Sequence, residues 1–355
     1  LHDALPIYQV AGPVGEALVM TAAGLGVALP AVLAYNVFNR RVARLEADLE
    51  GFARDLRLAF AARPRAISPK YFYDAEGSRL FELICEQPEY TLTATETALL
   101  EQQAPAIAAA LGPGTLVEFG AGSARKAAPL LGALRDPAYV ALDISAEHLA
   151  QACGRLQRQF PTVPMLGICC DYSQLQQLPP HPLLSGSAHL GFFPGSSLGN
   201  FEPDAAIALL AQFRRLLGPG GQLLIGIDQP KAVERLEAAY NDAAGISAAF
   251  ALNLLQRLNR DLQGTFNPEG FRYRARWVPE ASHIEMALVS QRQQQVIVAG
   301  QRWCFAKGEA LITETSAKYS PEAFVRLAAA AGWRGQARWS DGANDLSLHL
   351  LVQAD

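Results

Sequence analysis

Apolar and polar positions along the chain predict a repeating series of strands and helices. From Thr115 onward, short apolar runs are followed by turns and then by segments with helical spacing. The predicted strands are 115–119, 139–143, 165–170, 189–193 and 221–228, and the predicted helices are 124–134, 146–160 and 203–217. Apolar strands that alternate with helices are typical of an α/β fold, in which a parallel sheet is covered on both faces.

The pattern differs on either side of this region. Upstream, we predict a short helix over 77–86 and a longer one that opens with a capping box at Thr93 and Glu96 and ends near Leu111. Downstream, the pattern predicts a helix over 231–262, antiparallel strands over 271–314 and a helix over 321–331. Strand-like segments follow near 337 and over 346–352. A return of these last segments to the sheet is one option. We therefore divide the chain into an N-terminal segment (1–62), an α/β core (63–230 and 332–355) and a second α+β domain (231–331).

The N-terminal segment contains an apolar run, residues 17–38, without a charged residue, and Arg40, Arg41 and Arg44 follow it. A run of this length spans a bilayer as a helix, and its basic flank would place the following residues in the cytoplasm. A signal peptide is disfavoured because no basic segment precedes the run. Residues 8–56 resemble the last membrane helix and cytoplasmic tail of the MotA/TolQ/ExbB proton-channel family.

A lone final helix cannot form the multi-helix channel of that family. We interpret the segment as foreign to the rest of the chain, the product of a gene fusion or an assembly artefact, and expect the remainder to be cytoplasmic. A genuine membrane anchor and a buried amphipathic helix are the alternatives. A proton-channel function would rest on this segment alone.

Composition favours a small-molecule partner for the remainder. The formal net charge is -4 and no Lys/Arg-rich run is present, which argues against nucleic acid. The five cysteines form no CxxC pair and the six histidines form no HxH or HxxxH pair, so we expect no metal site. Half of the residues are hydrophobic, enough for a sizeable core.

A glycine-rich turn after the first parallel strand is the strongest local signal. Gly120 and Gly122 allow a tight turn that approaches a ligand closely. Asp143 ends the next strand, where its carboxylate can accept hydrogen bonds from two ribose hydroxyls. Asp171 follows the third strand, placed to meet an adenine amino group, with Tyr172 beside the base. The alternative is an ordinary strand–helix turn in which the two aspartates cap helices.

The identity of the cofactor follows from what the turn lacks. Arg125 stands where the dinucleotide fingerprint has its third glycine. This counts against NAD, whose pyrophosphate needs the close approach of the helix. It suits S-adenosylmethionine, which carries no phosphate.

Six long motifs carry a resemblance to a known family. In chain order they are YFYDAEGSRLFELICEQPEYTLTATE, VEFGAGSARK, FFPGSSLGNFEP, AAYNDAAGISAAFALNLLQRLNRDL, IEM and ITETSAKY. From about Pro64 to the C-terminus the chain resembles the histidine Nα-methyltransferases of ergothioneine biosynthesis. The resemblance implies a Rossmann-like S-adenosylmethionine methyltransferase sheet with a second, α+β substrate-binding domain. Relatives of that family include fungal enzymes that act on tryptophan derivatives, so another amine stays the alternative substrate.

The resemblance also implies roles for individual residues, with L-histidine as substrate and its trimethyl betaine, hercynine, as product. The implied cofactor contacts are Gly120, Lys126, Asp143, Asp171 and Tyr172. The implied substrate contacts are Asn200 and Tyr240 for the carboxylate and amino end, Tyr73 and Tyr90 near the amine, and Glu314, Ser316 and Met286 around the imidazole. Tyr73 or Tyr240 would accept the departing proton directly or through water, while Asn200 orients the amine.

Two of these residues can be argued from their chemistry alone. Asn200 follows a parallel strand, where α/β folds place ligands, and its amide can serve both a carboxylate and an amine. Its alternative is a loop asparagine in a left-handed turn beside Gly199. Glu314 alternates with two threonines in a strand, and its alternative is a solvated strand face. If Glu314 is buried it needs a partner, which an imidazole N–H would supply, with Ser316 at the other ring nitrogen. Met286 has core packing as its alternative, and a cofactor-binding module without catalysis is a further alternative for the whole chain.

Overall fold

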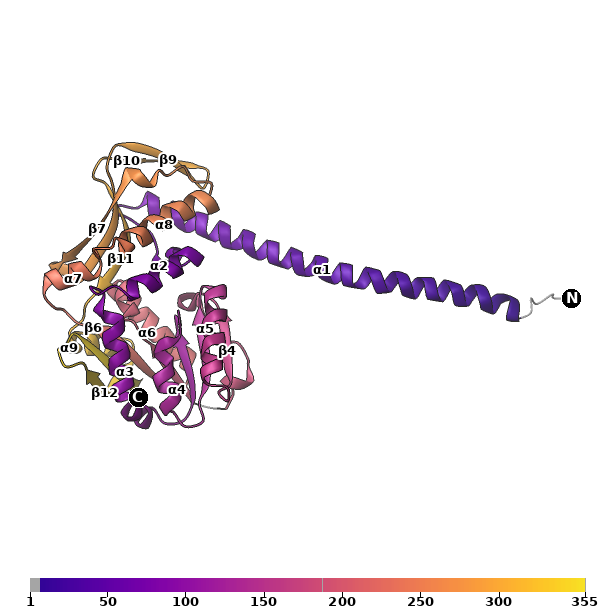
Figure 1. Cartoon of the computed structure of the whole chain (residues 1–355), viewed down its shortest axis with the longest axis horizontal. Helices are drawn as coiled ribbons and strands as arrows, with labels where there is room; N and C mark the ends of the chain where they lie inside the picture. The colour runs from indigo at the N-terminus through magenta and orange to yellow at the C-terminus, as the bar shows by residue number, and fades with distance from the viewer. Residues whose placement is uncertain (1–6, 187, 355) are drawn as a thin grey trace. The chain divides into compact units, whose positions relative to one another are not determined.

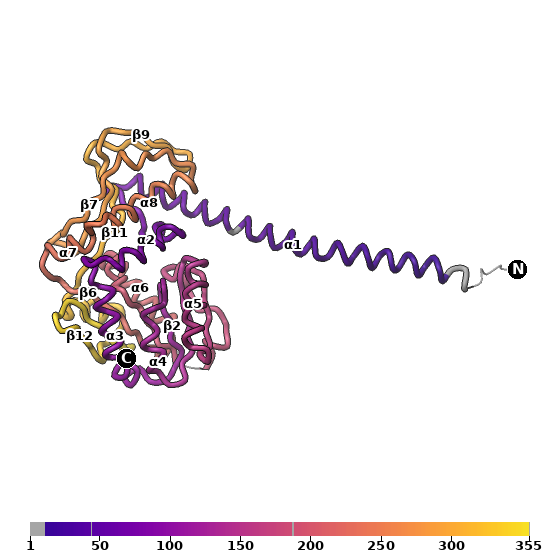
Figure 2. Tube along the Cα trace, viewed as in Figure 1, coloured from indigo at the N-terminus to yellow at the C-terminus, as the bar shows by residue number. Residues whose placement is uncertain are grey.

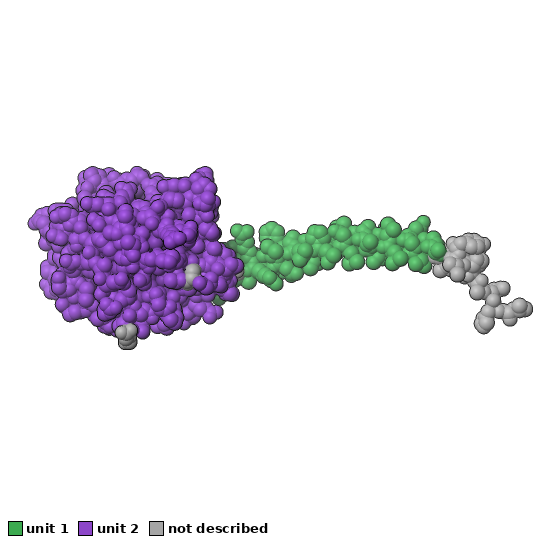
Figure 3. All heavy atoms as spheres, turned by 90° about the horizontal axis from the view of Figure 1, so that it is seen from below, with its two compact units in different colours: residues 1–58 green, residues 59–355 purple. Residues whose placement is uncertain are grey.

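The computed structural model describes residues 7–186 and 188–354. Residues 1–6 of the predicted N-terminal segment, and residues 187 and 355, lie outside this description. The chain divides into two compact units, residues 1–58 and residues 59–355 (Figure 3). The two units are described separately below.

The first unit is formed by helix α1 (Ile7–Ala61), which continues to the start of the second unit. The predicted apolar run is helical, and α1 is long and apolar enough to cross a membrane by length and composition alone. The side chains of residues 11–43 and 45–50 are exposed. The alternatives of a genuine membrane anchor and of a buried amphipathic helix stay predictions.

The second unit is built on a seven-stranded sheet in the order β12-β13-β6-β5-β2-β3-β4 (Figure 1). Strands β2 to β6 are mutually parallel, whereas β13 runs antiparallel to both β6 and β12. The predicted parallel strands are confirmed, and the last two segments do return to this sheet. The bounds are β2 (Thr115–Phe119), β3 (Ala138–Asp143), β4 (Met165–Cys169), β5 (His189–Phe193), β6 (Gln222–Asp228), β12 (Trp333–Ser340) and β13 (Leu346–Gln353).

Helices cover both faces of this sheet. On β6, Leu223 and Ile225 join a buried cluster with residues of α6 (Pro203–Leu217) and α9 (Pro321–Ala330). A Cβ at Gly226 would point to the opposite face, where it would meet the side chain of Glu96 in α3 (Thr91–Leu111). Since neighbouring residues of a strand face opposite sides, α3 and the α6–α9 pair lie on different faces. Helices α4 (Ala128–Ala133) and α5 (Ala146–Gln159) follow β2 and β3.

A second sheet of four strands has the order β1-β11-β8-β7. Its bounds are β1 (Arg65–Ala66), β7 (Phe271–Val278), β8 (His283–Ser290) and β11 (Ala310–Ala317), and β9 (Gln294–Val298) and β10 (Gln301–Phe305) form a separate hairpin. Residues distant in sequence meet here, because α2 (Ala75–Cys85) packs beside α8 (Ile246–Asp261) (Figure 2). Strand β1 belongs to the predicted α/β core, which begins at residue 63. It nevertheless pairs with β11 of the predicted second domain. The predicted domain limits at 230/231 and 331/332 stay a prediction.

Two details of the predicted helices are wrong. The helix expected to open with a capping box already begins at Thr91, so Thr93 and Glu96 lie inside it, and Glu96 is buried. The helix expected over 231–262 is two helices, α7 (Val233–Ala239) and α8. Asp242 breaks the run because its carboxylate accepts from the backbone N–H of Ile246 and Ser247 at the start of α8, at 2.7 Å each.

Candidate functional site

A cavity in the second unit gathers side chains from the four-stranded sheet, from helices and from the segment that follows β5. Its interior offers about 70 Å³ to the centres of water-sized molecules, several times what one water needs. All seven residues predicted to contact the substrate line it: Tyr73, Tyr90, Asn200, Tyr240, Met286, Glu314 and Ser316. The five predicted cofactor contacts are not part of this lining.

Asn200 and Glu314 form the polar pair of the cavity. The Asn200 amide donates to Glu314 Oε1 at 2.7 Å, joining the 3₁₀ helix η5 (Ser197–Asn200) to β11. Gly199 makes this approach possible, because a Cβ at that position would lie 2.6 Å from the carbonyl oxygen of Ala317. Burial raises the pKa of Glu314 to about 7, against the opposing charge of Lys318. Glu314 thus titrates near neutrality and faces a ligand as a strong acceptor above that pH.

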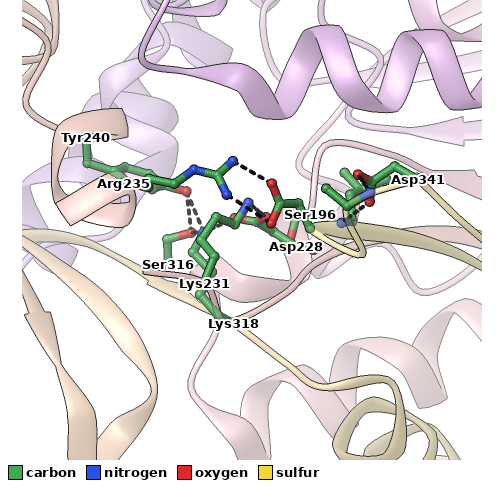
Figure 4. Close-up of polar contacts among 11 residues, drawn as sticks. Ser196, Asp228, Lys231, Arg235, Tyr240, Ser316, Lys318 and Asp341 are labelled. Carbon is green, nitrogen blue, oxygen red and sulfur yellow. Dashed lines mark hydrogen bonds and ion pairs between the residues drawn. The ribbon is translucent and has the colours of Figure 1, made fainter. Parts of the chain in front are cut away.

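A second polar cluster contains the side chains of Tyr240, Ser316 and Lys318 (Figure 4). Their hydroxyl oxygens lie 2.8 Å apart, and Lys318 Nζ donates to both. Lys318 also forms an ion pair with Asp228 at the end of β6, at 2.7 Å, and Lys231 pairs with the same carboxylate. Sequence reasoning missed Lys318 and Asp228. The signal was present for Lys318, which lies in the ITETSAKY motif two residues after Ser316.

Aromatic rings form much of the remaining wall. The Tyr73 ring makes edge contacts with Phe81 and Phe250, at centroid distances of 5.6 and 5.7 Å. The Tyr90 and Tyr240 rings meet edge to face at 5.8 Å. Phe81 and Phe250 were missed because aromatic rings at helical spacing are indistinguishable from core packing in a sequence. Such a wall presents π-faces that attract a cation.

Three tyrosines of the wall, Tyr73, Tyr90 and Tyr273, are uncharged near neutral pH. Burial, and next the charge of Glu314, raises the pKa of Tyr73 well above its usual value. Burial likewise raises the pKa of Tyr90 and of Tyr273, whose hydroxyl donates to the Tyr240 carbonyl at 2.7 Å. Tyr273 was also missed by sequence reasoning. These phenols are hydrogen-bonding groups and not preformed bases.

The predicted glycine-rich turn has the expected geometry. Gly120 and Gly122 adopt φ of 72° and 52°, in the region that favours glycine. The Asp143 carboxylate accepts from the Gly122 N–H at 2.8 Å and from the Ser145 N–H at 2.9 Å. A Cβ on Gly120 would lie 3.2 Å from the Tyr172 ring, whereas the corresponding position at Gly122 is open. The turn, Asp143 and Tyr172 therefore lie together and leave room for a ligand beside Gly122.

The other two predicted cofactor residues are held by partners. Asp171 caps the 3₁₀ helix that starts at Tyr172, accepting from the Ser173 N–H, and lies 3.4 Å from Lys70 Nζ. Lys126 Nζ lies 2.6 Å from the carboxylate of Glu96. A turn whose lysine is already paired suits a ligand without phosphate groups, which is the condition S-adenosylmethionine meets.

Glu96 links this turn to the cavity wall and was mistaken for a capping residue. Its side chain is fully buried, and both carboxylate oxygens accept from the N–H of Gly195, at 2.9 and 2.8 Å. Gly195 lines the cavity, and Lys126 belongs to the turn. Glu96 therefore fixes the position of one site relative to the other.

Glu118 supports a prediction about stability and pH. Burial raises the pKa of this carboxyl, which is hydrogen-bonded to the Tyr139 hydroxyl, from 4.5 to about 8. A raised pKa in the folded state stabilises the fold below pH 4.5, and this contribution is lost as the pH rises through about 8. Relative to Glu118→Gln, the wild type should lose at most about 1.4 kcal/mol of unfolding free energy per pH unit across that window.

Urea unfolding at several pH values measures this difference. Glu101→Gln, on the exposed side of α3, is the matched control and should follow the wild type. Parallel pH profiles for Glu118→Gln and the wild type would show that Glu118 does not carry the effect.

Metal-ligating side chains do not gather in the described residues. Over 7–186 and 188–354 there is no group of three or more His, Cys, Asp or Glu residues able to hold an ion. None of the five cysteines forms a disulfide.

Comparison with known proteins gives two matches in different parts of the chain. Residues 2–51 match the MotA/TolQ/ExbB proton channel family. Residues 52–353 match the family described as histidine-specific, S-adenosylmethionine-dependent methyltransferases. The boundary between the two matches falls close to the boundary between the two compact units.

Curated relatives agree with the second match. The histidine N-alpha-methyltransferase of Mycolicibacterium smegmatis is 37% identical over 310 residues, covering 86% of this chain and 95% of the relative. That of Mycobacterium tuberculosis is 34% identical over 307 residues, covering 84% and 94%. A 4-dimethylallyltryptophan N-methyltransferase of Epichloe festucae var. lolii is 24% identical, covering 89% and 98%. The chain belongs to the family of histidine-specific, S-adenosylmethionine-dependent methyltransferases.

Proposed function

We propose that this chain transfers methyl groups from S-adenosylmethionine to the α-amino nitrogen of L-histidine, ending at the trimethyl betaine hercynine of ergothioneine biosynthesis. The observation that carries the choice of substrate is the Asn200–Glu314 pair in the wall of the cavity. One Glu314 oxygen accepts from Asn200, and the other has no hydrogen-bond partner within residues 7–186 and 188–354. An imidazole N–H supplies that partner.

The opposite end of the substrate would lie among the amide of Asn200 and the aromatic rings. Asn200 offers a donor to a carboxylate and an acceptor to an amine. Tyr73 and Tyr90 surround this end, with the ring of Tyr240 beside Tyr90, and these rings tolerate an amine that becomes a trimethylammonium cation. Met286 is buried beside them in the wall, where it fills space around the ring.

Methyl transfer needs an amine with a free lone pair. The cofactor supplies an electrophilic methyl group on a sulfonium sulfur. Free α-amino groups titrate within a few units of neutrality, so a strong base is not required. Because burial keeps Tyr73 protonated, its oxygen accepts the amine proton only in transit, toward water. Most of the rate then comes from orientation of the amine by Asn200 and the tyrosines, worth up to roughly 7–11 kcal/mol in ideal intramolecular systems.

Gly120, Gly122, Asp143, Asp171 and Tyr172 would hold the cofactor, with Lys126 paired to Glu96 beside them. Asp143→Ala should weaken S-adenosylmethionine binding about 100-fold, because two ribose hydroxyls lose a charged acceptor at roughly 1.5 kcal/mol each. Isothermal titration calorimetry measures the dissociation constant. Asp204→Ala, an exposed aspartate in the first turn of α6, is the control. An unchanged dissociation constant for Asp143→Ala would remove this residue from the cofactor site.

A tryptophan derivative is the second candidate substrate, because one relative carries that specificity in its name. An indole ring has one N–H and no acceptor nitrogen, so it would satisfy Glu314 and leave the Tyr240 and Ser316 hydroxyls without a ligand acceptor. Initial rates with L-histidine, L-tryptophan and a prenylated tryptophan, each with saturating S-adenosylmethionine, test the choice. We expect kcat/KM to be highest for L-histidine, and a higher value for either indole would reverse the assignment.

The methyltransferase activity is assigned to residues 59–355, which we expect to act in the cytoplasm. The first unit carries the match to another family and an exposed apolar run. Membrane fractionation of cells that express either the full chain or residues 59–355 separates the interpretations. Equal activity of both forms supports a foreign segment, whereas activity only in the full, membrane-bound chain supports a functional anchor.

A further inference from the structure

Lys318 is a buried cation at the junction of the two sheets of the second unit. It follows β11, is 2% exposed, and pairs at 2.7 Å with Asp228 at the end of β6. A buried ammonium group needs acceptors for its three hydrogens. The other two acceptors are the hydroxyl oxygens of Tyr240, at 2.7 Å, and Ser316, at 2.9 Å (Figure 4). Although burial alone would lower it, the charge of Asp228 raises the pKa of Lys318 above its usual value.

The hydrogens of this cluster can be counted. Both hydroxyl oxygens accept from Lys318, and they lie 2.8 Å from each other. One hydroxyl therefore donates to the other, and one hydroxyl hydrogen is left over. No acceptor for it lies within residues 7–186 and 188–354. Because Tyr240 and Ser316 both line the cavity, this hydrogen is available to a bound ligand.

We propose that Lys318 is a positioning residue that sets the Tyr240 and Ser316 hydroxyls as a single donor facing the substrate, so that the cavity selects an uncharged ring in one tautomer. The proposal rests on the proposed function. Glu314 takes a ring N–H, and the donor takes a ring nitrogen with a lone pair. A neutral imidazole meets both demands in one of its two tautomers. An imidazolium has N–H groups on both sides and meets only one of them.

The charges around the ring also favour an uncharged ligand there. Lys318 and Lys231 are balanced by Asp228 and Glu314, so these four groups sum to zero when Glu314 is ionised. An added ring cation would lie beside the Lys318 ammonium, which already touches both hydroxyls. Burial raises the pKa of Tyr73, Tyr90 and Tyr273 in the same wall, so these phenols add no charge.

A measurement on the unaltered chain tests the tautomer directly. The full chain is saturated with S-adenosylhomocysteine and with L-histidine labelled with ¹⁵N at both ring nitrogens. Nitrogen NMR is recorded at about pH 6 and about pH 8, on either side of the ordinary imidazole pKa. We expect one protonated and one unprotonated nitrogen at both pH values, because a ring N–H donated to Glu314 favours the ionised carboxylate in the complex. Two protonated nitrogens at the lower pH, or signals averaged over two tautomers, would overturn the proposal.

A variant tests the part played by Lys318. The comparison substrate is an alanine that carries a pyrrole ring, which has an N–H and no acceptor nitrogen. The wild type should prefer L-histidine in kcat/KM by about 100-fold or more, because the analogue leaves the donor unpaired. Lys318→Met should reduce this ratio at least about tenfold, since the freed hydroxyls then accept as readily as they donate.

Lys231→Met is the matched control, because Lys231 also pairs with Asp228 but touches neither hydroxyl. It should keep the substrate ratio of the wild type. An unchanged ratio in a folded Lys318→Met variant would overturn the positioning role. If the wild type neither binds nor methylates L-histidine, the proposed function fails, whereas a methylated histidine that binds as imidazolium contradicts only the inference about Lys318.

Discussion

Glu314→Ala should lower kcat/KM for L-histidine by about three orders of magnitude. The substitution leaves two groups unpaired in the cavity, the Asn200 amide and the imidazole N–H. An unpaired buried group costs roughly 1–3 kcal/mol, and about 4 kcal/mol for the two corresponds to a thousandfold loss. Steady-state kinetics with saturating S-adenosylmethionine measures the effect.

Glu285→Ala is the control, because Glu285 lies on the neighbouring strand β8 and pairs with Arg274 and Arg276 outside the cavity lining. It should keep most of the wild-type kcat/KM. A Glu314→Ala variant as active as this control would show that Glu314 does not contact the substrate.

The pH profile of Glu314→Gln provides a second test of Glu314 as a substrate acceptor. In the wild type, the pKa of about 7 means that the carboxylate acceptor is lost as the pH falls below neutrality. The low-pH limb of kcat/KM therefore includes the protonation of Glu314 in the free enzyme. Glutamine is neutral at every pH, so this limb should flatten relative to the wild type, at a lower overall value.

Glu96→Ala should destabilise the second unit by about 3 kcal/mol, the scale of a broken buried ion pair. The fully buried carboxylate pairs with Lys126 and accepts from the Gly195 N–H, and alanine leaves both without their partner. Lys126 is 18% exposed, so water screens part of the loss and the estimate lies at the lower end of the range for such pairs.

Urea unfolding of the full chain, followed by tryptophan fluorescence, measures this loss. Glu101→Ala, on the exposed side of the same helix α3, should change the unfolding free energy by less than about 0.5 kcal/mol. Equal stability of the two variants would mean that Glu96 does not hold the glycine-rich turn against the cavity wall.

The parallel sheet was predictable because its strands are short apolar runs separated by clear turn signals. The return of residues 346–353 to the sheet was only one option, since a strand alone does not specify its neighbour. Local signals also misled. Thr93 and Glu96 fit a capping box, but a helix that begins at Thr91 turns Glu96 toward Gly226 and Gly195 instead. Tertiary pairing of a buried carboxylate decided its role.

The candidate site was likewise predictable only in part from the sequence. Asn200 and Glu314, which lie within unusual motifs, were predicted as site residues, and the structure places both in the cavity wall with Nδ2 and Oε1 2.7 Å apart. Asp228 ends an apolar strand and Tyr273 lies in a second sheet, and neither position carries a local signal for the cavity. Their contribution arises only when the two sheets meet, as the Asp228–Lys318 pair shows.

The central claim is tested most directly by the product of a single reaction. The full chain is incubated with S-adenosylmethionine and L-histidine, and the products are followed by mass spectrometry with fragmentation. We expect histidine to gain one, two and then three methyl groups, all on the α-amino nitrogen. A folded chain that binds the cofactor and leaves histidine unmethylated, or that methylates the imidazole ring, would contradict the account.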